Sequence, residues 1–377
     1  MKNDQVRIEI TQKIAEAVKQ GCAPWRRPWG NNPEKTKLCV PMTLPKNFLT
    51  GHRYSGVNPL LIMLACDTHG FASPYWGSMN QWSQIGAYVQ PRPHHVPEGH
   101  WGTSIVFYTQ IEKKRETQDT PAIPTEDGDV DKIMIMRRYT IFNADQVVPP
   151  NVDMMLKAKP DVQVKLAKKI LGETIKKMTP HIAEQIRTKV EQRLSAYKTK
   201  EVAPPAVSED YAIAANFLTA TGARIKHGGN RAFYKGRPAD YIQLPPAEAF
   251  DDLSAYYETA YHELCHWAED GKRVGQSPKH KGKKGDGYAF SELVAEIGAC
   301  FLAAETGLPI HQSMLPRSQS YVEYWLGQMG SDPKFIFEAA TQSGKVVDYL
   351  LQLQGQQPCQ SPATTGQSKN SSHCAVA

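Results

Sequence analysis

The sequence lacks the features of a membrane or secreted protein. No run of apolar residues approaches the roughly 20 that a membrane-spanning helix needs. Residues 1–5 lead directly into a polar helical pattern and contain no apolar segment of the kind that secretory signals carry. The seven cysteines are scattered, odd in number and include no Cys-x-x-Cys pair, which disfavours a disulfide framework and a cysteine zinc site. We therefore predict a cytoplasmic protein with reduced thiols and no membrane partner.

A strong charge of either sign is also missing. The net charge of +6 over 377 residues is mild, so it permits an anionic partner such as nucleic acid without requiring one. Apolar residues make up 41% of the chain, which is enough for ordinary buried cores, and the length suggests two domains with connecting segments.

The pattern of apolar residues and turn residues predicts an α+β fold with four parts along the chain. These are a small α+β domain over 1–148, a basic helical connector over 149–208, a second domain over 209–354 and a disordered tail over 355–377. In the first domain we expect helices over 4–20, 59–66 and 80–85 and strands over 103–111 and 133–142, with Asn58 as the cap of the second helix.

The connector has more basic than acidic residues. Its apolar spacing predicts two amphipathic helices that are broken near Pro180. Two interpretations stay open: a solvated helical connector, or a basic arm that contacts nucleic acid.

The strongest local signal is the motif His262-Glu263-Leu264-Cys265-His266. Residues four apart share one face of a helix, so both imidazoles can point at one metal ion. Glu263 follows the first histidine, where it can act as a general base toward an activated water molecule. Two neutral imidazoles and a carboxylate suit one Zn²⁺ ion better than magnesium or calcium.

A zinc site of this kind needs a third protein ligand. Glu292 and Glu296 lie four apart at the edge of an otherwise apolar helix, where carboxylates are costly unless they are paired. We assign Glu292 to the metal and Glu296 to an N–H group of a ligand histidine, although the reverse assignment and two solvated glutamates stay open. Ser254 is the expected cap of the motif helix, and Cys265 is expected to be a small buried residue.

Several motifs in the same order resemble the ArdC-type antirestriction proteins. The N-terminal patterns are Trp25-Arg26-Arg27-Pro28-Trp29, Gly51-His52-Arg53-Tyr54-Ser55-Gly56-Val57-Asn58 and Tyr139-Thr140-Ile141-Phe142-Asn143-Ala144-Asp145-Gln146. The C-terminal patterns are Tyr241 to Pro245, His262 to Trp267, Glu292 to Glu296 and Tyr321 to Leu326. Cys265 departs from this resemblance, because such proteins usually carry glycine there.

The resemblance implies a protein of a plasmid or mobile element that protects incoming DNA from restriction during conjugation. It implies an N-terminal domain that binds single-stranded DNA and a C-terminal zincin-like, gluzincin-like metallopeptidase domain. Zinc would be held by His262, His266 and Glu292, with Glu263 as the catalytic carboxylate. The peptide or protein substrate is not identified by it.

Aromatic and basic residues are interleaved in the first 101 residues, and this mixture suits the stacking of unpaired bases and the binding of phosphates. The alternative is that most of these aromatic residues belong to the core. Given the resemblance, we predict DNA contacts at five positions: Trp25, Arg26, Arg53, Tyr54 and Asn58.

Three functions remain open from the sequence. The first is a zinc peptidase that its DNA-binding domain directs to substrates, with residues 241–244 as an edge strand that pairs with an extended peptide. The second is a protein that shields single-stranded DNA and has a structural or inactive zinc site. The third is a zinc-dependent nuclease. A purely structural site has no need of Glu263, which favours the first hypothesis.

Overall fold

The computed structural model describes most of the chain, and the fold below refers to those residues. They are residues 2–20, 23–25, 43–84, 86–114, 130–148, 160–171, 175, 177–195, 211–250, 252–280, 286–308 and 319–354. Arg26 and the predicted tail over 355–377 lie outside them.

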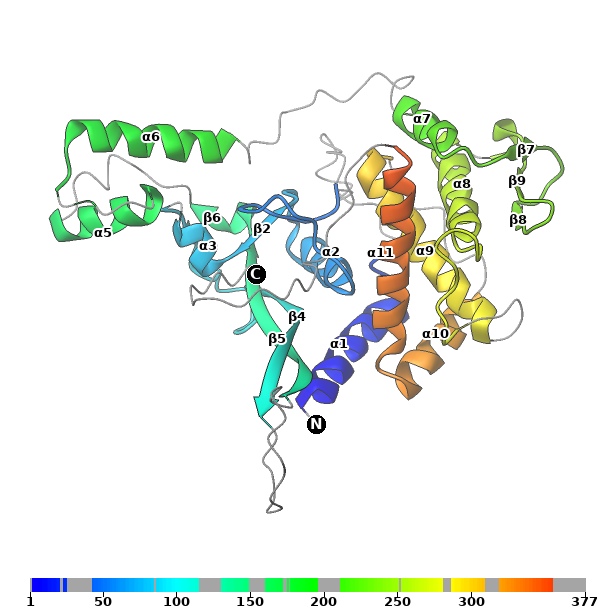
Figure 1. Cartoon of the computed structure of the whole chain (residues 1–377), viewed down its shortest axis with the longest axis horizontal. Coiled ribbons are helices and arrows are strands. Elements are labelled where there is room, and N and C mark those ends of the chain that lie inside the picture. The colour runs from blue at the N-terminus through cyan, green and yellow to red at the C-terminus, as the bar shows by residue number, and fades with distance from the viewer. Residues whose placement is uncertain are drawn as a thin grey trace, which may run out of the picture.

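The N-terminal domain is built on a four-stranded sheet in the order β1-β2-β5-β4, of which β2, β5 and β4 are labelled in Figure 1. Strands β4 and β5 form a long antiparallel hairpin, and β3 and β6 form a separate two-stranded sheet. The elements are α1 (Lys2–Lys19), β1 (Lys46–Asn47), α2 (Asn58–His69), β2 (Tyr75–Ser78), α3 (Met79–Gln84), β3 (Tyr88–Val89), β4 (Thr103–Lys114), β5 (Val130–Asn143), a 3-10 turn at Ala144–Gln146 and β6 (Val147–Val148). The predicted helices and strands of this domain are therefore confirmed, with shifts at their ends.

Helix α2 fills the centre of this domain. Its residues from Asn58 to Cys66 are all buried, as expected for a helix that is apolar on every side. The predicted cap was wrong: Val57 precedes the helix, and no side chain caps it. Asn58 instead pairs with the backbone of Val106 on β4, through one donated and one accepted hydrogen bond of 2.9 Å each. The amide thereby joins the helix to the sheet.

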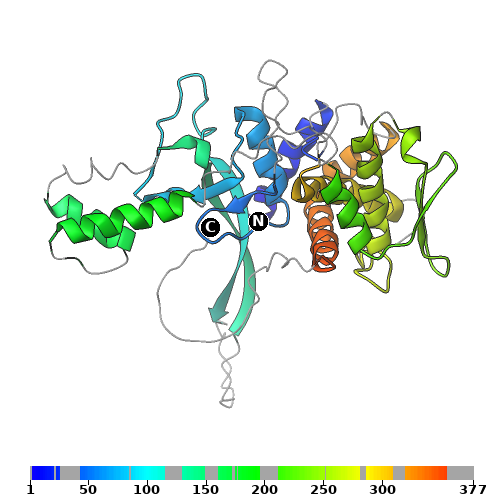
Figure 2. The same cartoon turned by 90° about the horizontal axis from the view of Figure 1, so that it is seen from above.

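Two helices, α5 (Pro160–Leu171) and α6 (Pro180–Ser195), follow in the basic connector. They form a helical pair at one edge of the molecule, and the break near Pro180 falls where the sequence predicted it (Figures 1 and 2).

The C-terminal domain is mainly helical and carries a small three-stranded sheet at the opposite edge of the molecule (Figures 1 and 2). Its elements are α7 (Ala212–Ala220), β7 (Ile225–His227), β8 (Phe233–Lys235), β9 (Tyr241–Leu244), a 3-10 turn at Ala247–Ala249, α8 (Leu253–Ala268), α9 (Asp286–Thr306), α10 (Gln319–Ser331) and α11 (Phe335–Gln352). Helix α9 packs against both α8 and α11 and forms the centre of the domain.

Strand β9 occupies the middle of this sheet. It pairs in parallel with β7 and antiparallel with β8, so both of its backbone edges are already hydrogen-bonded. Its bounds match the predicted strand, but the prediction that it is an edge strand was wrong. In the described part of the chain, the free edges of this sheet belong to β7 and β8.

The two domains share one continuous apolar core. Helix α1 packs against α10, and Ile10, Ile14 and Trp25 belong to the same buried cluster as Trp325 and Met329. Polar contacts cross the same interface, where the Thr11 hydroxyl donates to the carbonyl of Pro333 over 2.9 Å. The domains are therefore packed together as one body.

Helix α9 is the one described helix that is long and apolar enough to cross a membrane. Most of it is buried inside the protein, against α8 and α11. Its composition is accounted for by its place as a core helix.

Candidate metal centre

The motif helix α8 begins at a side-chain cap. Asp252 has an extended backbone, and its carboxylate accepts the N–H of Ala255 over 2.9 Å. Ser254 donates its hydroxyl to the same carboxylate. The predicted cap at Ser254 was therefore wrong, and Asp252 has that role because it occupies the residue before the helix.

The two histidines of the motif face each other across one helical turn. Their Nε2 atoms lie 3.1 Å apart, and their ring centroids are separated by 4.8 Å. His262 is buried and His266 is nearly so, on the side of α8 that meets α9. The spacing of four residues thus brings both imidazoles to one point.

Glu292 reaches the same point from α9. Its carboxylate oxygens lie 3.5 Å from Nε2 of His262 and 3.3 Å from Nε2 of His266. One potential ligand atom from each of the three residues lies within 4.8 Å of the other two. Two imidazole nitrogens and a carboxylate oxygen at such separations fit a single borderline-soft divalent ion such as Zn²⁺.

Glu296 lies one turn further along α9 and faces the other side of the first histidine. Its Oε1 is 3.8 Å from Nδ1 of His262, whereas Glu292 faces Nε2 of the same ring. The two carboxylates therefore address the two different nitrogens of one imidazole. This arrangement has the form of the predicted division between a ligand and a residue that orients a ligand.

Glu263 is buried at the motif and stays outside this group of three. Its charge is close enough to His266 to contribute to the raised pKa of that histidine. The position agrees with a carboxylate that works beside a metal ion and does not bind it.

The pKa values of the group reflect mutual pairing. Burial opposes the charged form of Glu292, but hydrogen bonds from His262 and His266 outweigh it and hold its pKa well below the usual range. Burial likewise lowers the pKa of His266, but the hydrogen bond to Glu292 and the nearby carboxylates raise it to about 9. The negative surroundings that retain a proton on His266 would equally favour a divalent cation.

A hydrogen-bonded chain behind His266 was not predicted from the sequence. The Ser291 hydroxyl lies 3.3 Å from Nδ1 of His266 and donates to the buried carboxylate of Glu269 over 2.5 Å. Gln342 on α11 bonds the other oxygen of that carboxylate. Since the hydroxyl proton goes to Glu269, Ser291 is left to accept the Nδ1–H of His266, which turns the Nε2 lone pair toward His262 and Glu292.

A second missed residue lies at the mouth of the site. Tyr288 is 41% exposed, and its ring lies 6.1 Å from that of Tyr321, with Glu292 also close to its hydroxyl. Burial and the proximity of Tyr321 and the Glu292 carboxylate raise the pKa of its phenol, so Tyr288 keeps its hydroxyl proton near neutral pH. The sequence signal was weak, because a tyrosine four residues before a glutamate is common on helices.

Cys265, between the two histidines in the sequence, also packs against α9. It is fully buried, and a Cβ atom added to Gly298 would lie 2.7 Å from its sulfur. Burial and nearby carboxylates raise the pKa of the thiol well above its ordinary value. The prediction of a small buried residue is confirmed, and the close approach of the two helices depends on glycine at 298.

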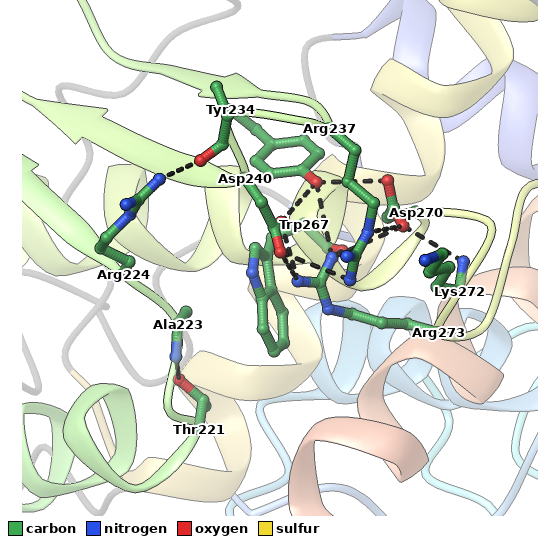
Figure 3. Close-up of polar contacts among 11 residues, drawn as sticks. Thr221, Ala223, Arg224, Tyr234, Arg237, Asp240, Trp267, Asp270, Lys272 and Arg273 are labelled. Atoms are coloured by element: carbon green, nitrogen blue, oxygen red, sulfur yellow. Dashed lines mark hydrogen bonds and ion pairs between the residues drawn. The ribbon is translucent and has the colours of Figure 1, made fainter.

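An ionic cluster fastens the small sheet to the end of α8 (Figure 3). The Arg273 guanidinium lies 3.6 Å from the ring centroid of Trp267 and donates to both carboxylate oxygens of Asp240 over 2.8 Å. Tyr234 on β8 donates to Asp240 over 2.8 Å and contacts Asp270, just beyond the helix end. Strand β8 is therefore held near the half of α8 that carries His266. The other edge strand lies near the helix start, where His227 is 2.8 Å from the hydroxyl of Tyr256.

Four of the five residues predicted to contact DNA are buried in the protein or held in an ion pair. Trp25, Tyr54 and Asn58 are 3%, 6% and 5% exposed, so none of them offers a free face to a base. Arg53 forms an ion pair of 3.4 Å with Glu305 on α9. These positions do not support the prediction for four of the five residues, and Arg26 lies outside the described residues. The physical reason is that core packing and base stacking draw on the same aromatic residues.

Two protein families match this chain, each over a different part of it. Residues 4–142 match the N-terminal domain of anti-restriction factor ArdC, and residues 212–342 match the zincin-like metallopeptidase family.

Curated relatives cover nearly the whole chain but differ in length. A DNA primase TraC of Escherichia coli is 28% identical over 361 residues, which make up 93% of this chain and 27% of the primase. A second TraC primase of that species is 27% identical, over 92% of this chain and 20% of its own length. This chain thus spans about a quarter of the primases that it matches. The uncharacterized protein y4eC of Sinorhizobium fredii is 25% identical over 90% of both chains.

Two solved structures of the antirestriction protein ArdC from plasmid R388 share the fold. The metal-free structure is 26% identical with a TM-score of 0.61, and it aligns over 93% of this chain and 98% of its own. The Mn(II)-bound structure is 25% identical with a TM-score of 0.58, over 92% of this chain and 97% of its own.

Proposed function

We propose that this chain, which has the two-domain architecture of the ArdC antirestriction proteins, is a metal-dependent peptidase that also binds single-stranded DNA. Its biological role would be antirestriction for a plasmid or another mobile element. The observation that carries the proposal is the convergence of His262, His266 and Glu292 on one point, with Glu263 beside it.

In this proposal, His262, His266 and Glu292 hold one Zn²⁺ ion. When bound, such an ion acts as a Lewis acid and makes a water molecule nucleophilic near neutral pH. Glu263 serves as the general base, because its carboxylate lies near His266 but does not belong to the three proposed ligands. It accepts a proton as the peptide carbonyl is attacked and returns it to the leaving amine.

The residues around the ligands hold them in the reactive arrangement. Glu296, whose Oε1 lies 3.8 Å from Nδ1 of His262, would favour a proton on that nitrogen, and the Ser291–Glu269 pair would do the same for His266. Both imidazoles then present unprotonated Nε2 atoms. Tyr288 stands at the mouth of the site, where its hydroxyl can donate to the carbonyl oxygen of a bound peptide.

An extended substrate would pair with β8. This strand has a free edge in the described sheet, and Tyr234 fixes it over the end of α8 that carries His266. Addition of a peptide strand to a sheet edge satisfies its backbone groups without fixing its sequence. Side chains of the substrate would therefore be selected elsewhere in the site.

The DNA-binding part of the proposal rests on the N-terminal family match and on the titles of the solved relatives. A competing function is a protein that only shields DNA and uses the metal for structure. The R388 protein has the same fold in metal-free and Mn(II)-bound structures, which argues against a metal needed for folding. We place the activity in the cytoplasm, where restriction takes place.

Metal content and hydrolysis test the proposal together. Elemental analysis should find about one zinc ion per wild-type chain and almost none in His262→Ala. A proteome-derived peptide library should be cleaved by the wild type and not by Glu263→Gln, while Glu323→Gln, an exposed glutamate on α10, should cleave normally. Retention of zinc by His262→Ala would overturn the ligand assignment. Full antirestriction activity of Glu263→Gln in cells would favour the shielding function.

A further inference from the structure

The helical pair α5–α6 is a small body with its own core. Both helices begin at proline, which suits the first turn of a helix, and they pack on each other. Ala167, Ile170, Ile175 and Ile186 form a buried cluster separate from the cores of the two domains. The pair stands at the edge of the molecule beside the N-terminal domain, far from the three-stranded sheet (Figures 1 and 2).

The net charge of the protein is concentrated in this part of the chain. Residues 149–208 contain twelve lysines and arginines against six aspartates and glutamates, a surplus of six. The whole chain carries a net charge of +6, so the remaining residues are neutral in sum. Neither family match includes this segment, since one ends at residue 142 and the other begins at 212.

Three lysines of the pair are exposed in the described residues. Lys165 and Lys168 lie three apart on α5 and therefore share one face, and Lys177 lies in the connection to α6. Lys189 differs, because its ammonium donates to the carbonyl of Leu171 at the end of α5 over 3.1 Å. Lys189 thus stabilises the helix end. Within the described residues, Lys165, Lys168 and Lys177 make no such hydrogen bond to a helix end.

We propose that the exposed lysines of α5–α6, Lys165, Lys168 and Lys177, bind the phosphate backbone of single-stranded DNA. This inference rests on the proposed DNA-binding function and adds a second contact surface to it. The charge surplus provides complementarity to phosphates, and the position beside the N-terminal domain allows one strand to reach both. The contact would be independent of base sequence, because lysines neutralise phosphates without reading bases.

An anionic membrane is the less favoured partner. Amphipathic helices bind membranes by inserting an apolar face, and here the apolar residues of both helices pack against each other. Every apolar side chain of the pair that the structure describes is buried or half-buried. A surface that binds by charge alone fits a polyanion in solution better than a lipid interface.

Counterion release gives the proposal a quantitative signature. Each phosphate neutralised by a lysine contributes about 0.7 to the slope of log affinity against log salt for single strands. Replacing three such lysines by glutamine should lower the magnitude of that slope by about 2 and weaken binding at least about tenfold near 0.1 M salt.

The test uses the full-length protein, a fluorescent 30-mer of mixed sequence and a series of salt concentrations. The variant Lys165→Gln/Lys168→Gln/Lys177→Gln is compared with Lys272→Gln/Lys334→Gln/Lys345→Gln, which removes equal charge from exposed positions of the C-terminal domain, outside β8. We expect the lower slope and weaker binding only in the first variant, with equal peptide hydrolysis in both.

Equal affinities and slopes for the two variants and the wild type would overturn the inference and leave DNA binding by the N-terminal domain intact. An unchanged affinity for DNA with weaker binding to phosphatidylserine vesicles would overturn it in favour of a membrane surface. A wild type that binds no DNA at all would remove the DNA part of the proposed function as well. Thermal unfolding of both variants checks that the helical pair is folded.

Discussion

Trp25 of the N-terminal domain packs edge-on against Trp325 of the C-terminal domain, with ring centroids 6.4 Å apart and ring planes at 73°. Trp325 donates its indole N–H to the carbonyl of Ala289 over 2.8 Å. Ala289 precedes Ser291 and Glu292 on α9. A continuous set of contacts therefore leads from the N-terminal domain to the helix that carries the candidate metal ligand.

Substitution of Trp25 separates a structural role from a role in DNA binding. Trp25→Ala should lower the free energy of unfolding by about 3–5 kcal/mol, because it leaves a large cavity between the domains. Trp25→Phe should lower it less, since an edge-on ring contact is retained. Denaturant unfolding measures both changes. An unchanged stability of Trp25→Ala with a loss of DNA affinity would restore the DNA contact that the sequence suggested.

The Ser291 hydroxyl should matter for metal affinity. Ser291→Ala breaks the link between His266 and Glu269, and loss of such a supporting hydrogen bond typically weakens metal binding by about 10–100-fold. Competition with a chromophoric chelator measures the affinity for zinc. Ser343→Ala is the matched control, because that buried hydroxyl bonds the backbone carbonyls of Val294 and Ala339 and makes no hydrogen bond to His266 or Glu269. Equal zinc affinities of the two variants would contradict the role of Ser291.

The sequence was informative where chemistry depends on local spacing. The four-residue repeats that align His262 with His266 and Glu292 with Glu296 are properties of any α-helix, and the structure brings these four side chains together. The Ser291–Glu269 link joins residues 22 apart, and Arg53 reaches Glu305 from another domain. Such contacts depend on how elements pack, which periodicity does not encode.

The same limit explains the two corrections to the predicted interaction surfaces. The composition of residues 241–244 identifies a strand, but its central place in the sheet follows from pairing with β7 and β8. Aromatic residues near the N-terminus are equally suited to a core and to stacking on bases, and here the core contains the predicted ones.

The contact between Cys265 and Gly298 predicts a compensating pair of substitutions. Gly298→Ala should destabilise the protein by about 1–3 kcal/mol, because its Cβ would lie 2.7 Å from the Cys265 sulfur in a packed core. Adding Cys265→Gly removes that sulfur and should recover part of the loss. A double-mutant cycle of unfolding free energies measures the coupling. Additive effects of the two substitutions would show that the helices adjust independently of this contact.

Acid should weaken the attachment of the small sheet to α8. Burial tends to raise the pKa of Asp240, but the hydrogen bonds and charge of Arg273 outweigh it and lower the pKa below the ordinary 3.8. The ion pair therefore stabilises the folded state fully above about pH 4 and is lost as the pH falls through the lower pKa of the folded state.

Asp240→Asn isolates this charge. Asparagine tolerates the positive φ of 48° at this position, so the backbone should not change. The wild type should be more stable than the variant at pH 7, and the difference should shrink toward pH 3. Chemical unfolding at a series of pH values measures it. A difference that is independent of pH would show that the ion pair with Arg273 contributes nothing.

The apolar core that α1 and α10 share also limits the use of truncated forms of the protein. Removal of residues 1–148 would expose Trp325 and Met329 to water, and a fragment with such a bare apolar strip is prone to self-associate. Loss of hydrolysis in that fragment would then report aggregation. A requirement for DNA is better sought with point substitutions in the intact chain than by cutting it in two.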